Sequence, residues 1–174
     1  MIQEKNKKIY TFSEKKDQII LRSVLDPFDF DAYSQKEIDA LVRHMRTMMV
    51  RNNGIGLSAN QIGINARVFV AQLPKKNGRG YEGKFYAVFN PVLSKRSLKK
   101  LDDEEGCLSI PGIYGSIKRA AKVTLDGFDK NKRKVHIVAS GMLARIFQHE
   151  IDHLDGKVFA DSAKDLFTIE KSNY

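Results

Sequence analysis

The sequence GMLARIFQHEIDHL, residues 141–154, has the spacing of a helix that is buried on much of its surface. Ser140 precedes it with a residue type suited to an N-cap, and Gly156 follows it with the residue that most often ends a helix. The apolar side chains that form its broad face are Leu143, Ile146, Phe147, Ile151 and Leu154. A helix this apolar packs in the core, so its histidines are buried or line a cleft.

The second half of this helix contains the pattern H-E-x-x-H, from His149 to His153. Residues four apart on a helix differ by about 40° around the axis and about 6 Å along it, so two such histidines can bind one cation. Glu150 is offset from the pair, which suits a general base acting on a water at the metal better than a third ligand. The same pattern also occurs by coincidence in unrelated chains.

A catalytic tetrahedral metal usually takes three protein ligands, so a further donor is needed. The acidic residues after His153 do not form a recognisable protease arrangement; they are Asp155, Asp161, Asp165 and Glu170. The other candidate is the only cysteine, Cys107, in EEGCLSIPG (104–112). The glycines and proline around it indicate an irregular, closely packed strand, although buried filler is the alternative. A single cysteine excludes an intramolecular disulfide and fits a reducing compartment.

A third unusual stretch is NGIGLSANQIG, residues 53–63. Its G-x-G spacing lacks the preceding strand of a dinucleotide-binding fingerprint, so a phosphate loop is not expected. The loop leads to Gln61, whose amide can donate to an oxygen near a metal. A turn-stabilising role for Gln61 is the alternative.

The rest of the chain predicts one further helix and several strands. Ser34 and Glu37 match a capping box, and apolar residues then follow at helical spacing as far as Asn53. β-Branched and aromatic runs predict strands over 66–73, 84–93, 122–128 and 134–139, with the last two joined as a hairpin. Residues 1–18 are polar, and we expect them to be partly loose.

Length and charge limit the classes of protein to consider. The chain has 174 residues with 42% hydrophobic content, which fits one core. It has neither an apolar signal segment nor a run of about 18 apolar residues, so we expect a cytoplasmic protein with no membrane partner. Lys and Arg outnumber Asp and Glu by 30 to 21. The basic residues are scattered among polar and acidic ones, so they predict solvated loops and no specific nucleic-acid site.

Three motifs in order resemble those of peptide deformylases: G-I-G-L-S-A-N-Q (54–61), E-G-C-L-S (105–109) and H-E-I-D-H-L-D-G (149–156). The resemblance covers roughly residues 20–162. It implies an α+β fold with antiparallel strands around a central metal-bearing helix, in one catalytic domain over 19–174 with a short C-terminal tail. The implied reaction removes the N-formyl group from the formyl-methionine of nascent polypeptides and releases formate. An HExxH zinc endopeptidase is the alternative, but it has no use for E-G-C-L-S.

The resemblance also assigns roles by position. It implies that Glu150 is the acid/base and that Gln61 and the backbone N–H of Leu108 stabilise the oxyanion. The implied metal ligands are Cys107, His149 and His153. The candidates for the peptide channel and the methionine pocket are Gly56, Ile55, Leu108, Ile110 and Ile146.

One divalent metal per chain is expected. Cysteine and histidine ligands suit zinc and iron alike, and the resemblance implies Fe²⁺ in the cell, with Zn²⁺, Ni²⁺ or Co²⁺ in a purified sample. This chain departs from the family in having Ser58 where alanine is usual. Many bacterial members continue into a long basic helix that docks on the ribosome, whereas only residues 162–174 follow Asp161 here, so that docking mode is not expected. Arg119 matches a basic position after the second motif, and a salt-bridging role is the alternative.

Overall fold

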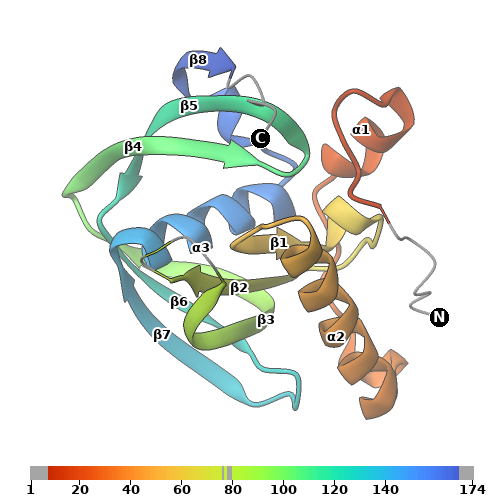
Figure 1. Cartoon of the computed structure of the whole chain (residues 1–174). Helices are drawn as coiled ribbons and strands as arrows, with labels where there is room; N and C mark the ends of the chain where they lie inside the picture. The colour runs from red at the N-terminus through yellow and green to blue at the C-terminus, as the bar shows by residue number, and fades with distance from the viewer. Residues whose placement is uncertain (1–7, 76, 78–79, 169–174) are drawn as a thin grey trace.

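The structure is a computed structural model that describes residues 8–75, 77 and 80–168. Its strands form two antiparallel sheets, with helix α3 lying between them (Figure 1). The five-stranded sheet has the order β1-β2-β3-β6-β7, with bounds Gly56–Ser58, Val68–Pro74, Tyr81–Arg96, Lys122–Phe128 and Lys134–Ser140. The three-stranded sheet has the order β4-β5-β8, with bounds Lys100–Cys107, Ile110–Ala120 and Lys164–Thr168. The fold is therefore α+β with antiparallel sheets, as predicted.

Within the described residues, three α-helices accompany the sheets: α1 (Lys15–Leu21), α2 (Gln35–Arg51) and α3 (Gly141–Leu154). The predicted capping box of α2 is confirmed, because Ser34 Oγ accepts from the Glu37 N–H while the Glu37 side chain accepts from the Ser34 N–H. Short 3₁₀ helices lie at η1 (Phe30–Ala32), η2 (Ala59–Ile62) and η3 (Phe159–Asp161). No helix in the described part of the chain combines the length and apolar character needed to cross a bilayer.

Helix α3 has the predicted bounds. Ser140 occupies the N-cap position, although its side chain makes no capping hydrogen bond. Gly156 has a φ of 70°, and a Cβ there would overlap the carbonyl of Arg22, so glycine is required both for the turn and for close packing. The N–H of Leu25 donates to the Leu154 carbonyl at 2.9 Å, which ties the end of the helix to the segment after α1.

The core consists of two apolar clusters. One lies on α2 and includes the methionines predicted to be buried, Met45, Met48 and Met49. The other lies on α3 and includes Phe147, with no exposed surface. Helix α3 contacts β1 and β2 of the five-stranded sheet and β5 of the other sheet, so its polar residues lie between the two sheets.

The four predicted strands correspond to β2, β3, β6 and β7, and the predicted hairpin joins the last two. The irregular strand predicted over 104–112 coincides with the end of β4, the turn after it and the start of β5, whereas the remainder of these two strands, β1 and β8 were not predicted. Strand β4 has exposed side chains from Lys100 to Glu104, so it lacks the alternation of apolar and polar residues that marks a strand in the sequence.

The N-terminal segment from residue 8 onward lies against the first and second motifs, residues 54–61 and 105–109. The Tyr10 N–H donates to the Gln61 carbonyl at 2.8 Å, and the Phe12 N–H donates to the Ser109 carbonyl at 2.9 Å. Asp17 is buried and pairs with Lys8 at 3.2 Å. The predicted loose segment therefore packs against the fold over residues 8–18, while residues 1–7 and the predicted tail over 169–174 lie outside the described residues.

Candidate active site

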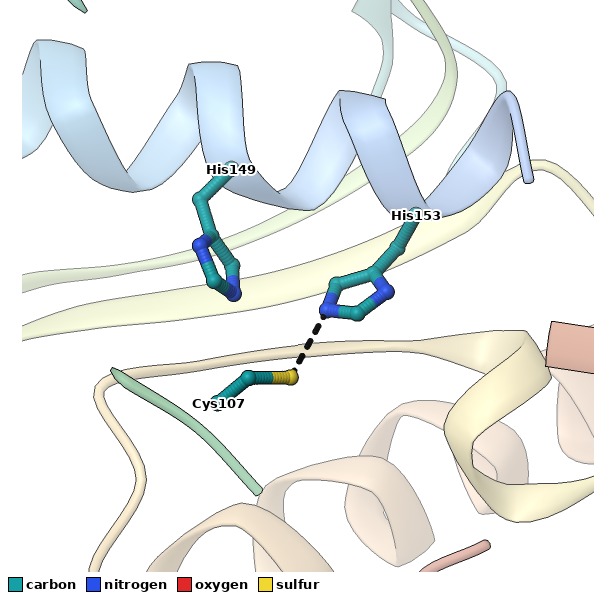
Figure 2. A group of neighbouring side chains, drawn as sticks. All are labelled: Cys107, His149 and His153. Atoms are coloured by element: carbon teal, nitrogen blue, oxygen red, sulfur yellow. Dashed lines mark hydrogen bonds between the residues drawn. The ribbon is translucent and has the colours of Figure 1, made fainter. Parts of the chain in front are cut away.

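The side chains of Cys107, His149 and His153 converge at one point (Figure 2). The two imidazoles extend from successive turns of α3 toward the end of β4, where Cys107 lies. One ligand atom from each residue lies within 4.8 Å of the others, and Cys107 Sγ is 3.1 Å from His153 Nε2. A thiolate and two imidazole nitrogens form a tridentate set that fits zinc or ferrous iron and leaves a fourth position open. The residues present therefore fit the expected metal.

The thiol of Cys107 has polar neighbours, which suit a candidate metal ligand better than apolar filler. Burial would raise its pKa, but the neighbouring His153 and His149 outweigh burial and hold the pKa well below its ordinary value. The Ser109 N–H and the Gln61 Nε2 also face the sulfur, at 3.4 and 3.5 Å. The surroundings thus favour the thiolate, which is the form that binds a metal.

Behind His149 stand four charged residues that we call the charged wall: Glu105, Arg119, Arg145 and Asp152. Glu105 Oε2 is 2.9 Å from His149 Nδ1 and also accepts from Arg119 at 2.9 Å. Glu105 Oε1 accepts from Arg145 at 2.7 Å and from Arg119 Nε at 2.9 Å. Arg119 also pairs with Asp152. The predicted salt-bridging role of Arg119 is confirmed.

The charged wall determines which ring nitrogen of His149 is available to bind a metal. Burial would raise the pKa of Glu105, but His149 and Arg119 lower it to about 2, so the carboxylate is ionised. An ionised acceptor at Nδ1 keeps the proton on that nitrogen and leaves Nε2 for a metal. Neither Glu105 nor Arg145 was assigned a role from the sequence, although Glu105 is the first residue of E-G-C-L-S. The sequence signal for Glu105 was its position two residues before the only cysteine.

Glu150 is buried beside the ligands on the same helix. Its Oε2 accepts from Ser58 Oγ at 2.6 Å, and a Cβ added to Gly56 would overlap its Oε1. Burial raises the pKa of Glu150, opposed by His149, His153 and the Ser58 hydrogen bond. A carboxyl group with a raised pKa in a closed site has the property expected of a general acid/base.

The first motif supplies the opposite side of the site, and we call Gly56–Ile62 the neutral loop. Gln61 Oε1 accepts from the Ser58 N–H at 2.9 Å, so the NH₂ end of the amide must face the other way. That end donates to Ser109 Oγ at 3.1 Å and faces Cys107 Sγ. Gln61 is thereby oriented as a hydrogen-bond donor toward the ligands.

The neutral loop also contacts His153. The Asn60 amide donates to the His153 carbonyl at 2.8 Å. Over the described ranges, Asn60 Oδ1 and His153 Nδ1 are buried without a hydrogen-bond partner. His149 and His153 therefore differ in the partner at Nδ1, since only His149 has a charged acceptor there.

The candidate pocket residues are not gathered in one cluster. Ile55 and Ile146 belong to the cluster on α3, whereas Leu108 packs against the cluster on α2. Ile110 belongs to neither cluster and pairs with Cys107 across the turn between β4 and β5. Leu108 is the first residue of that turn, directly after the cysteine.

Comparison with known proteins identifies the family. The profile described as polypeptide deformylase matches residues 6–168. The chain belongs to the peptide deformylase family. Removal of the N-formyl group from nascent polypeptides is therefore its activity, and the match sets aside the endopeptidase alternative.

Individual relatives agree with this family assignment. A peptide deformylase of Elusimicrobium minutum is 43% identical over 147 residues, which cover 83% of this chain and 82% of that one. The Acinetobacter baumannii enzyme with Met-Ala-Ser bound is 29% identical with a TM-score of 0.80, covering 88% of this chain and 96% of that one. The Synechococcus elongatus enzyme in complex with actinonin is 29% identical with a TM-score of 0.78, covering 95% and 82%.

Proposed function

We propose that the chain deformylates N-formyl-methionyl peptides with one divalent metal held by Cys107, His149 and His153 on and beside the central helix. The observation that carries this proposal is the convergence of the three ligand atoms within 4.8 Å, next to the buried Glu150. The relative with Met-Ala-Ser bound supports a peptide that begins with methionine. We propose Fe²⁺ as the ion in the cell, with Zn²⁺, Ni²⁺ or Co²⁺ able to replace it.

When bound, the metal supplies Lewis acidity that activates water and polarises a carbonyl. Glu150 is the residue that moves protons in this proposal. It accepts a proton from the attacking water, holds it in its low-dielectric position, and transfers it to the departing α-amine as the C–N bond breaks. The products are formate and a free N-terminus.

Gln61 and the backbone N–H of Leu108 are the proposed donors to the formyl oxygen as negative charge develops there. The Ser58 N–H fixes the Gln61 amide with its NH₂ toward the site, so no reorientation is needed during the reaction. Gly56 is assigned to the peptide channel. The methionine pocket is assigned to Ile55, Leu108, Ile110 and Ile146.

The wider assignments follow from this activity. We place the catalytic domain over residues 19–174 and the protein in the cytoplasm, where nascent chains are made. The ribosome is a candidate partner through its emerging peptides.

Formate release from formyl-Met-Ala-Ser, by anaerobically purified and metal-analysed protein, tests the proposal. The matched control is acetyl-Met-Ala-Ser, whose extra methyl would displace the reacting carbonyl. A displacement of about 1 Å costs on the order of 10²-fold, so acetyl peptide should be nearly inert. Comparable kcat/KM values for the two peptides would contradict the proposed specificity.

The variant Glu150→Gln separates proton transfer from metal binding. It should retain nearly stoichiometric metal while turnover falls by a factor on the order of 10² or more. Loss of metal together with activity would make Glu150 a ligand instead.

A further inference from the structure

Ser58 contacts both reactive side chains of the proposed mechanism. It is the last residue of β1 and has no exposed surface. Its Oγ lies 2.6 Å from Glu150 Oε2, and its backbone N–H donates to Gln61 Oε1 at 2.9 Å. The backbone contact is available to any residue at this position. The hydroxyl contact depends on the serine side chain itself.

We propose that Ser58 is a positioning residue that holds the Glu150 carboxylate in one orientation for proton transfer. This inference rests on the proposed role of Glu150. A glutamate side chain has several rotatable bonds, and a fixed orientation requires contacts at its end. The Ser58 hydroxyl engages Oε2, which leaves Oε1 as the oxygen that exchanges protons.

Gly56 completes this arrangement from the same strand. Its missing side chain leaves the space into which Oε1 projects, because a Cβ at this position would overlap that oxygen. One strand of three residues therefore both anchors one carboxylate oxygen and makes room for the other. Replacing Ser58 with alanine would remove the hydroxyl anchor and would leave the space at Gly56 unchanged.

A purely structural role for the hydroxyl is the competing explanation. Ser58 Oγ also lies 3.0 Å from the Glu150 carbonyl, where a bond would simply join β1 to α3. A hydroxyl has one hydrogen and can donate to only one of these acceptors at a time. The carboxylate is nearer, at 2.6 Å, and hydrogen bonds to ionised acceptors are about twice as strong as neutral ones. The carboxylate contact therefore dominates.

The kinetic test uses the zinc-loaded full chain, with formyl-Met-Ala-Ser as substrate. Ser58→Ala should lower kcat on the order of tenfold, with KM and zinc stoichiometry unchanged. An unchanged or increased kcat would overturn the proposal, since it would show that the hydroxyl is idle or only weakens the base.

A double-mutant cycle separates positioning from general structural support. In a Glu150→Gln background the base is already lost, so Ser58→Ala should reduce the residual kcat by less than about twofold. A loss of similar size in both backgrounds would show that Ser58 acts through the fold and not through Glu150.

A structural readout is independent of turnover. In crystals of the zinc-loaded protein, the Glu150 carboxylate should occupy one orientation in the parent and more than one in Ser58→Ala. A carboxylate that keeps its place in the variant would overturn the proposal. If the parent itself releases no formate, the proposed function fails, while the crystals still show whether Ser58 holds Glu150.

Discussion

The charged wall and the neutral loop hold their sides of the site by different means. In the charged wall, Glu105 lies among Arg119, Arg145 and His149, at distances of 2.7–2.9 Å. In the neutral loop, Ser58 and Gln61 are fixed through hydroxyl, amide and backbone groups. A ligand must stay in place throughout the reaction, and buried ion pairs achieve this because breaking them is costly. The proposed donors to the developing oxyanion carry no net charge. They therefore do not alter the net charge around the proposed metal ligands.

The largest effect should come from breaking the charged wall at its centre. Glu105→Gln leaves the buried guanidinium groups of Arg119 and Arg145 without their common carboxylate, which should lower the free energy of unfolding by about 3–5 kcal/mol. Loss of the charge on the acceptor at His149 Nδ1 should weaken metal binding by about 10–100-fold. Urea unfolding and metal titration measure the two effects. Near wild-type stability would show that the network is not held by charge.

The neutral loop should show the opposite pattern, a large effect on turnover. Gln61→Leu removes one oxyanion donor, which typically costs about 2.7–4 kcal/mol in the transition state. We expect kcat to fall far more than KM rises, with metal content retained. Steady-state kinetics on formyl-Met-Ala-Ser measure this, and a change confined to KM would make Gln61 a substrate-binding residue only.

Gly56→Ala tests the space beside the base. The added Cβ would overlap Glu150 Oε1, so the carboxylate must move. We expect turnover to fall on the order of 10²-fold, because displacing a reacting group by about 1 Å has that effect. Metal analysis serves as the control, since the ligands lie elsewhere. Wild-type kcat would show that the carboxylate moves without loss.

The most gradual effect concerns acid pH, because it is spread over several pH units. The folded-state pKa of Glu105, about 2, lies below the ordinary value of 4.5. A depressed carboxyl pKa contributes stability above the unfolded-state value, and this contribution is lost as pH falls from 4.5 toward about 2. The loss is at most about 1.4 kcal/mol per pH unit. The free energies of unfolding of wild type and Glu105→Gln should therefore converge over this range. A constant difference between them would contradict the lowered pKa of Glu105.

The sequence predicted the elements whose apolar residues are periodic. Helix α3 and helix α2, with its Ser34 capping box, were predicted on that basis. The H-E-x-x-H spacing also anticipated the approach of His149 and His153, because one helix sets that geometry by itself. Local patterns are sufficient for these features.

The charged wall could not be predicted in the same way. Glu105 meets Arg119 fourteen residues away and Arg145 forty residues away, and no local pattern relates them. The first part of strand β4, from Lys100 to Asp103, was missed because its residues face solvent and lack apolar alternation. The proposed pocket was likewise chosen by residue type, and the structure divides Ile55 and Leu108 between two clusters.

The contact between Ser58 and Glu150 joins residues that are 92 positions apart in the chain. During synthesis the neutral loop leaves the ribosome long before helix α3 exists, so its hydroxyl and amide groups stay hydrated until the last ligands emerge. Cys107 likewise has no histidine partner until that helix is made. With the proposed ligand set, metal binding would follow the synthesis of residue 153. A truncated chain that ends before residue 149 would contain the whole neutral loop but would lack both histidines and Glu150.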